Sequence, residues 1–247
     1  MPDLASEPKF LEPLLGLVFD LDGTLVLSHH AFGTTRREVV RIAERPGVPP
    51  GTLSVREPVH RLVEQSREQL RKANAPDGEL FRFEAEVPKA IDAIEMEALP
   101  RTVSRPGAAA LLDALQARGF RLGVLTRSSE SFARAALART GLGPHFAYLR
   151  SRSAPGPAKP SPESLLLLLH EMGVPIERAL YVGDHLLDAE CARAARVRFY
   201  AVLPDPSEKE DLAAAADRFR GAGASAIAPD LEALARFLAV APAVRAA

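Results

Sequence analysis

The sequence has one cysteine and almost no net charge. A single cysteine, Cys191, excludes an internal disulfide framework and fits a reducing compartment. The formal net charge of -1 over 247 residues gives no reason to expect nucleic acid or an anionic membrane as a partner.

Long apolar segments are missing as well. Apolar runs such as Leu165 to Leu169 are far too short to span a bilayer. Residues 1–8 lack the basic and apolar regions of a secretory signal peptide. Because the composition is also that of an ordinary globular protein, with 47% hydrophobic and 26% charged residues, we expect a soluble, cytoplasmic protein.

Apolar strands and helices alternate in the second half of the chain. The apolar pattern predicts strands at 120–126, 147–149, 179–182 and 198–203. Helical spacing and end signals predict helices at 106–118, 130–139, 162–172, 186–195 and 231–238. Such an alternation is typical of a parallel sheet that is covered by helices on both faces.

The first half of the chain follows a different pattern. The apolar run 14–19 predicts a buried strand, and after it the sequence is helical at 34–44, 55–73 and 79–98. Pro88 is expected to kink or split the third of these helices. We therefore predict the α/β class, with a doubly wound parallel sheet from residues 1–27 and 102–247 and a small helical domain inserted at 28–101.

Two carboxylates stand where the first strand ends. Asp20 and Asp22 follow Phe19 directly, and the carboxyl end of a strand is where open parallel sheets bind ligands. This placement is poor for packing but suits a nucleophile, a proton-transfer partner and a divalent-cation site. The pair Asp22-Gly23 also occurs in ordinary turns, so this motif alone leaves both interpretations open.

Three further motifs decide between these interpretations. They are an apolar strand ending in a hydroxyl residue, a lysine before a helix, and an acid pair, at Leu122 to Thr126, Lys159 to Glu163 and Gly183 to Asp188. Together with Asp20 to Thr24, and in this order, they resemble the haloacid dehalogenase-like (HAD) hydrolase superfamily. The similarity is to its helical-cap branch, which includes phosphoglycolate phosphatases and beta-phosphoglucomutases, and it covers most of the chain.

The resemblance implies a role for each catalytic candidate. Asp20 would be the nucleophile that forms an aspartyl-phosphate. Asp22 would protonate the leaving alcohol and later act as the base for the attacking water. Thr126 would donate its hydroxyl to a phosphoryl oxygen, and Lys159 would hold Asp20 and offset the charge of the transferring group. Taken alone, Thr126 and Lys159 would be ordinary strand-end and loop residues.

The resemblance also implies Mg²⁺ as the cofactor. The family holds this ion through the side chain of Asp20, the backbone carbonyl of Asp22 and the side chain of Asp184. Asp188 would join or orient that ligand shell. Asp184 and Asp188 also fall near the start of a predicted helix, where acids are favourable in any case, and this effect is compatible with metal binding.

Four residues near these motifs are candidates for substrate binding. Gly23 and Thr24 would shape the turn and offer backbone N–H groups to phosphoryl oxygens. Arg127 could reach an anionic group of the substrate, or it could form a surface salt bridge instead. His185 stands where the family commonly has a small hydroxyl residue, so the local pocket is expected to differ in shape and polarity.

The leading hypothesis is a Mg²⁺-dependent phosphatase that acts on a small phosphorylated metabolite. A phosphomutase is the nearest alternative, because it uses the same aspartyl-phosphate and both acids of the first motif. Dehalogenase and phosphonatase activities are disfavoured, since those branches lack the second aspartate and Asp22 is present. A non-catalytic binding protein on the same fold is a third possibility. The sequence leaves the substrate and the oligomeric state open.

Overall fold

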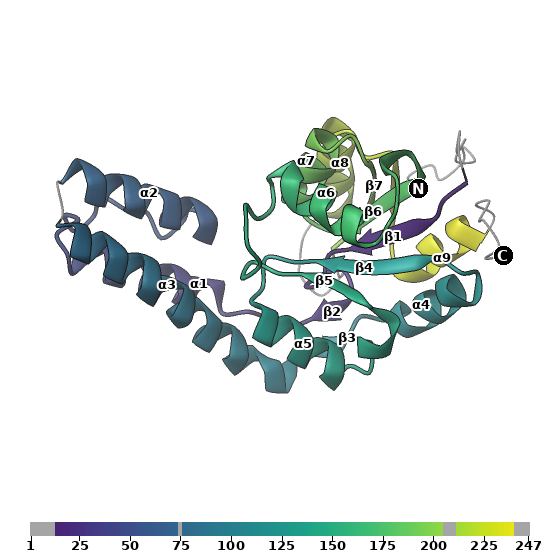
Figure 1. The fold of residues 1–247 in the computed structure, drawn as a ribbon, viewed down its shortest axis with the longest axis horizontal. Coiled ribbons are helices and arrows are strands. Elements are labelled where there is room, and N and C mark those ends of the chain that lie inside the picture. Colours follow the sequence, from purple (N-terminus) through teal and green to yellow (C-terminus); the bar gives the residue numbers. More distant parts are fainter. Residues whose placement is uncertain (1–12, 74–75, 205–210, 240–247) are drawn as a thin grey trace. The chain divides into compact units, whose positions relative to one another are not determined.

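The computed structural model describes residues 13–73, 76–204 and 211–239, and residues 1–8 fall outside these ranges. The chain divides into two compact units (Figure 1). Residues 1–28 and 102–247 form one, which we call the core unit. Residues 29–101 form the other, which we call the helical unit.

The described part of the core unit is built on a sheet of six parallel strands in the order β5-β4-β1-β6-β7-β8. The central strand β1 pairs with β4 on one side and β6 on the other, so that Phe19 lies opposite Val124 and Val182. This arrangement confirms the predicted doubly wound fold class. The strands are β1 (Gly16–Phe19), β4 (Arg121–Leu125), β5 (Tyr148–Arg150), β6 (Ala179–Gly183), β7 (Arg198–Val202) and β8 (Ala226–Ala228).

Helices cover both faces of this sheet. One face packs against α4 (Ala108–Ala117), α5 (Glu130–Arg139) and α9 (Leu231–Ala239), and the other against α6 (Pro162–Glu171), α7 (Leu186–Ala194) and α8 (Leu212–Gly221). Successive strand side chains point to opposite faces, so Leu17 and Phe19 join the first core cluster and Val18 joins the second. Burial on both sides explains why β1 is a continuous apolar run rather than an alternating one.

Some short elements of the core unit were not predicted. Strand β8 has three residues, and the antiparallel pair β2 (Val26–Leu27) and β3 (Val103–Ser104) has two residues in each strand. Segments this short contain no full period of a hydrophobic pattern, so sequence periodicity does not indicate them. Single turns of 3-10 helix occur in the core unit at η2 (Gly143–His145) and η3 (Ile176–Arg178), and η1 (Leu99–Arg101) lies at the end of the helical unit.

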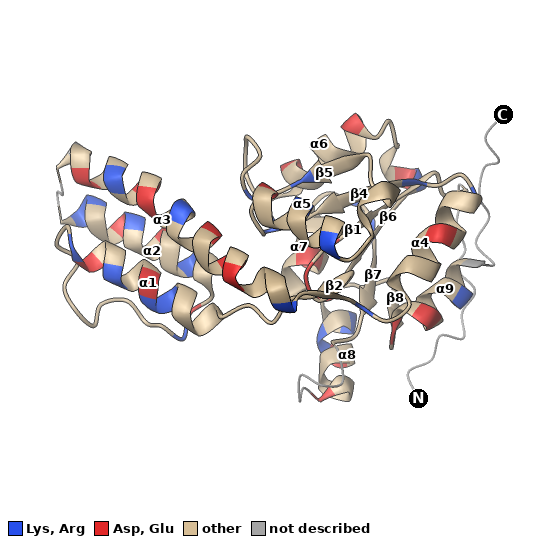
Figure 2. Ribbon diagram, turned by 90° about the horizontal axis from the view of Figure 1, so that it is seen from below, with Lys and Arg blue, Asp and Glu red and all other residues tan. Residues whose placement is uncertain are grey.

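The helical unit consists of α1 (Phe32–Glu44), α2 (Val59–Lys72) and α3 (Asp77–Ala98). Its own apolar core includes Leu62, Phe83 and Val87. Helix α3 continues through Pro88, so the expectation that this proline might split the helix is wrong. Pro88 is exposed while its neighbour Val87 is buried, so core packing on the opposite face holds the helix together. Charged residues of both signs are distributed along these helices (Figure 2).

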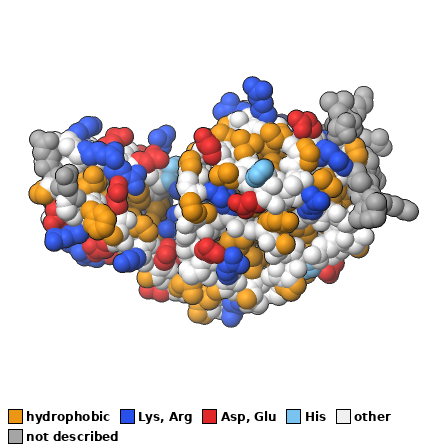
Figure 3. All heavy atoms as spheres, in the orientation of Figure 1, with side chains coloured by type: hydrophobic (Ala, Val, Ile, Leu, Met, Phe, Trp, Pro, Cys, Tyr) orange, Lys and Arg blue, Asp and Glu red, His pale blue; other side chains and the backbone are white. Residues whose placement is uncertain are grey.

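The surface carries charges of both signs. On the face shown in Figure 3, basic and acidic side chains are interspersed with apolar ones. Within the described ranges, no helix combines the length and the apolar character that crossing a membrane requires.

Candidate active site

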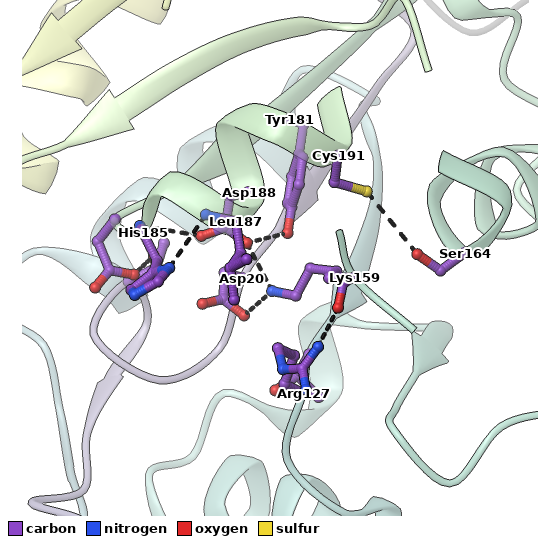
Figure 4. Close-up of polar contacts among 12 residues, drawn as sticks. Asp20, Arg127, Lys159, Ser164, Tyr181, His185, Leu187, Asp188 and Cys191 are labelled. Atoms are coloured by element: carbon purple, nitrogen blue, oxygen red, sulfur yellow. Dashed lines mark hydrogen bonds and ion pairs between the residues drawn. The ribbon is translucent and has the colours of Figure 1, made fainter. Parts of the chain in front are cut away.

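The predicted motifs meet at one edge of the sheet. Asp20 follows β1, Thr126 follows β4 and Asp184 follows β6, and these three strands are adjacent and parallel. Their carboxyl ends therefore lie at the same edge. Lys159 reaches this edge from the loop between β5 and α6, and Asp188 from the first turn of α7 (Figure 4).

A buried lysine joins two of the acids. The Nζ atom of Lys159 lies 2.6 Å from Asp20 Oδ1 and 2.7 Å from Asp188 Oδ1, and it donates a hydrogen bond to each. Lys159 is only 3% exposed and Asp188 is fully buried. Burial lowers the pKa of the Lys159 ammonium, but the Asp188 and Asp20 carboxylates together outweigh this effect and raise the pKa above its usual value, so the lysine stays charged at neutral pH. A solvated loop lysine, the alternative from sequence, is therefore excluded.

Three acids of this cluster can hold a cation together. One carboxylate oxygen each from Asp20, Asp184 and Asp188 lies within 4.8 Å of the others. Burial is the main cause that raises the pKa of Asp20 to about 7 and that of Asp184 well above its usual range. Lys159 supplies one positive charge against three carboxylates. An all-oxygen donor set of three carboxylates, which release their protons when a cation binds, fits a hard divalent cation.

The turn after β1 is packed against Asp184. Thr24 Oγ1 donates a hydrogen bond of 2.6 Å to Asp184 Oδ1, and Thr24 itself is fully buried. Gly23 adopts a φ of +86°, and a Cβ added there would lie 2.0 Å from Asp184 Oδ2. Gly23 therefore leaves the space in which the Asp184 carboxylate sits, and Thr24 fixes the orientation of that carboxylate.

We expect Gly23→Ala to weaken divalent-metal binding about 10- to 100-fold, the usual effect of disturbing groups that orient metal ligands. The added methyl group displaces the Asp184 carboxylate. Gly51→Ala is a matched control, because Gly51 has a φ of +82° and no atom within 4 Å of its added Cβ. Calorimetric titration of both variants with Mg²⁺ checks this, and equal affinities would contradict it.

Asp22 and Thr126 each accept a hydrogen bond from a nearby serine. The hydroxyl of Ser28 donates a hydrogen bond to Asp22 Oδ1. The Oγ1 atom of Thr126 accepts a hydrogen bond of 3.0 Å from the backbone N–H of Ser128, and Thr126 is buried. Because Thr126 Oγ1 accepts in this hydrogen bond, the O–H of Thr126 can still donate a hydrogen bond to a ligand at the edge of the sheet.

Arg127 braces the loop that carries Lys159. Its half-buried guanidinium donates to the backbone carbonyl of Lys159, and Arg152 Nε donates to the backbone carbonyl of Arg127 over 2.9 Å. The contact of Arg127 to substrate and its alternative, a surface salt bridge, both stay predictions. Arg127 thus helps to place the buried ammonium.

His185 begins helix α7. Its Nδ1 atom accepts a hydrogen bond of 3.1 Å from Leu187 N, and its backbone N–H donates over 3.1 Å to Asp188 Oδ2. The helix is therefore capped reciprocally by His185 and Asp188. Burial lowers the pKa of His185, so the ring is neutral at pH 7 and carries its proton on Nε2. A role of His185 in substrate binding stays a prediction.

Three residues that contact the candidate site were not predicted from the sequence. Ser28 holds Asp22, Tyr181 contacts Asp188, and the buried guanidinium of Arg105 donates to the backbone carbonyls of Gly23 and Leu203. For Ser28 and Arg105 the sequence carries no signal, because their partners depend on how the chain turns. Strand alternation could have placed Tyr181 on the face that packs against α7.

The family model of the haloacid dehalogenase-like hydrolases matches residues 15–196. This range includes all four motifs and most of the chain. The chain belongs to the haloacid dehalogenase-like hydrolase family. A phosphoglycolate phosphatase from Rhodospirillum rubrum is 34% identical to this HAD-like hydrolase over 185 residues, which cover 73% of this chain and 76% of the relative. The predicted relationship is thus confirmed.

Solved structures extend the likeness to the fold. A predicted phosphoglycolate phosphatase from Haemophilus somnus matches 92% of this chain and 98% of its own, with a TM-score of 0.61 and 18% identity. A candidate beta-phosphoglucomutase from Thermotoga maritima matches 92% of this chain and 100% of its own, with a TM-score of 0.59 and 22% identity. At these identities the likeness establishes the fold alone.

Family and relatives together make this HAD-like hydrolase a phosphatase. Phosphatases of this family generally use a divalent metal, and the acidic cluster at the edge of the sheet provides a donor set for one. When bound, such a cation supplies positive charge beside the transferring phosphoryl group. Phosphorylated small molecules are the substrates of phosphatases of this kind.

Divalent-metal affinity should rise with pH through neutrality. The pKa of Asp20 is about 7 without metal, so its carboxyl is mostly protonated below that pH and ionised above it. Because a metal ligand must be deprotonated, binding releases protons and is weaker at low pH. We expect the Mg²⁺ affinity to increase at least about fivefold from pH 6 to pH 8. Calorimetry in buffers of different ionisation enthalpy checks this, and a pH-independent affinity without proton release would refute it.

Proposed function

We propose that this HAD-like hydrolase removes phosphate from a small phosphomonoester with Mg²⁺ as cofactor and with an aspartyl-phosphate intermediate. The observation that carries this proposal is the buried contact of 2.6 Å between Asp20 and Lys159, beside two more carboxylates at the carboxyl edge of the sheet. Such a carboxylate, held next to a fixed positive charge, is placed for attack on a phosphoryl group rather than for packing.

In the first step, an oxygen of Asp20 forms a bond to phosphorus while the bond from phosphorus to the leaving alcohol oxygen breaks. Asp22 gives its proton to that oxygen. Lys159, fixed by Asp188, and the hydroxyl of Thr126 donate hydrogen bonds that offset the charge of the transferring group. The backbone N–H groups of Gly23 and Thr24 contribute in the same way.

In the second step, the Asp22 carboxylate takes a proton from water, whose oxygen attacks phosphorus. The bond between phosphorus and Asp20 breaks, phosphate leaves, and Asp22 is again protonated for the next cycle. The hydrogen bond from Ser28 to Asp22 supports this role, because it fixes the carboxyl that must face both alcohol and water.

The side chains of Asp20 and Asp184 and the backbone carbonyl of Asp22 would hold the Mg²⁺, with Asp188 completing the acidic cluster. The all-oxygen donor set supports Mg²⁺ over softer metals. Thr24 and Gly23, which orient and accommodate Asp184, support a site that is formed before the metal arrives.

We further propose that the helical unit is the cap that selects the substrate. Its separate apolar core supports an independent domain. Phosphoglycolate is the first substrate to test, because a relative that is 34% identical is a phosphoglycolate phosphatase. Arg127 and His185 are the candidates for contacting the organic part of the substrate.

Phosphate release from a panel of phosphomonoesters tests this function. The panel contains phosphoglycolate, sugar phosphates and nucleoside monophosphates, each with Mg²⁺, with EDTA, and with Mg²⁺ restored. We expect turnover of at least one compound, at least about 100-fold slower in EDTA and recovered with Mg²⁺. Phosphate release that EDTA does not slow would refute the proposed requirement for Mg²⁺. Isomerisation of a hexose 1-phosphate without phosphate release would identify a phosphomutase instead.

A further inference from the structure

Tyr181 brings a phenolic hydroxyl into the buried acidic cluster. The residue lies in the middle of β6 and is fully buried. Its hydroxyl is 2.6 Å from Asp188 Oδ1, the same oxygen that accepts from Lys159 Nζ at 2.7 Å (Figure 4). Burial and the nearby carboxylates raise the pKa of Tyr181 well above its usual value, so the hydroxyl keeps its proton and acts as the donor.

With this bond, protein groups engage both oxygens of Asp188. Oδ1 accepts from Lys159 and Tyr181, and Oδ2 accepts from the backbone N–H of His185 over 3.1 Å. The carboxylate is therefore fixed from three directions. Lys159 in turn is shared between Asp188 and Asp20 at nearly equal distances, 2.7 and 2.6 Å.

Packing does not require this hydroxyl. The residue opposite Tyr181 on the neighbouring strand β7 is Phe199, and the two rings contact edge to face at 5.8 Å between centroids. Phe199 is also buried, on the same face of the sheet. A phenylalanine thus fits this layer of the core, and the added oxygen of Tyr181 serves the contact with Asp188.

We propose that Tyr181 is a positioning residue for phosphoryl transfer, whose hydroxyl fixes Asp188 so that Lys159 remains shared with Asp20. This inference rests on the proposed function of Asp20 and Lys159. Without the hydroxyl, Asp188 Oδ1 loses one of its two donors and draws the Lys159 ammonium more strongly. The ammonium is then less available to Asp20 and to the transferring phosphoryl group.

The test compares Tyr181→Phe with Tyr200→Phe. Tyr200 is 2% exposed, lies on β7 and packs on the opposite face of the sheet against Phe237, with ring centroids 5.1 Å apart. Each variant loses one buried phenolic oxygen from the same sheet. We expect kcat to fall about tenfold in Tyr181→Phe with KM changed less than about twofold, and both constants to be unchanged in Tyr200→Phe.

A second measurement does not depend on turnover. The ¹⁵N resonance of the buried Lys159 ammonium, assigned by its loss in Lys159→Arg, should shift in Tyr181→Phe but not in Tyr200→Phe. The Lys159 nitrogen lies 5.8 Å from the centre of the Tyr181 ring, and phenylalanine keeps that ring, so a shift reports on the hydroxyl. If the wild type hydrolyses no phosphomonoester, the proposed function fails, and this resonance alone decides the positioning role.

Two results would overturn the proposal. One is an unchanged ammonium resonance in Tyr181→Phe. The other is an equal loss of kcat in Tyr181→Phe and Tyr200→Phe, which would mean that any buried phenol in this sheet matters only for packing.

Discussion

Asp20→Asn will lower phosphate release by on the order of 10⁴-fold or more, because an amide cannot serve as the nucleophile. The variant should nevertheless fold at least as stably as the wild type in EDTA at pH 7. The pKa of Asp20 is about 7 instead of its usual 3.8, so the folded protein binds this proton more tightly than the unfolded chain does. Ionisation above pH 4 therefore opposes folding, and asparagine removes that opposition.

Measurement of kcat and of the melting temperature checks both parts of this prediction. Asp217→Asn is the matched control, since the side chain of Asp217 is 75% exposed on α8 and should change neither value. An active Asp20→Asn protein would exclude Asp20 as the nucleophile. A melting temperature well below that of the wild type would show that its lost activity reflects unfolding.

Asp22→Asn separates the two steps of the reaction. With p-nitrophenyl phosphate, whose leaving group needs no proton, Asp20 can still be phosphorylated, but the attack of water lacks its base. Acid-quenched Asp22→Asn should therefore carry covalently bound phosphate, and Asp20→Asn should carry none. Covalently bound phosphate in both variants, or in neither, would contradict the roles assigned to Asp20 and Asp22.

The second large effect is expected for Lys159→Met. Methionine leaves the buried Asp20 and Asp188 carboxylates without the ammonium that now lies within 2.7 Å of both. Removing one partner of a buried ion pair typically costs about 3–5 kcal/mol in unfolding free energy. The loss of a charge beside the transferring phosphoryl group should also reduce kcat by about 10²–10³-fold.

Urea unfolding in EDTA and steady-state kinetics measure the two effects. Lys89→Met, at an exposed lysine of α3, is the control and should alter the unfolding free energy by no more than about 0.5 kcal/mol. Lys159→Arg keeps the positive charge, so it should recover more of the stability than of the activity, which depends on the position of the charge. Unchanged stability of Lys159→Met would mean that the two carboxylates do not need this partner.

The sequence allowed the sheet and the location of the site to be predicted for a physical reason. Buried strands of a parallel sheet are continuous apolar runs, and polar residues at their ends stand out against them. Asp20, Thr126 and Asp184 each follow such a run, and adjacent parallel strands bring the three together. The fold class was predicted correctly on this basis.

Other parts of the site could not be predicted, because they depend on tertiary packing. The guanidinium of Arg105 reaches Gly23 and Leu203, which lie 82 and 98 residues away along the chain. Arg127 and His185 occupy sequence positions that suggest substrate contacts, but the structure also gives their polar groups intramolecular partners. The hydrophobic periodicity of a sequence carries no information about such side-chain contacts. The roles assigned to the individual site residues remain predictions that the variants above will test.

The central position of β1 also has a consequence for biosynthesis. Asp20 precedes its lysine partner by 139 residues, and Thr24 meets Asp184 across 160 residues. The helical unit, whose contacts are local and whose core is its own, can fold while β1 still lacks both neighbouring strands. On the ribosome, β1 is therefore an apolar segment that stays unpaired until β4 and β6 emerge, and it is the segment of this chain that we expect chaperones to protect.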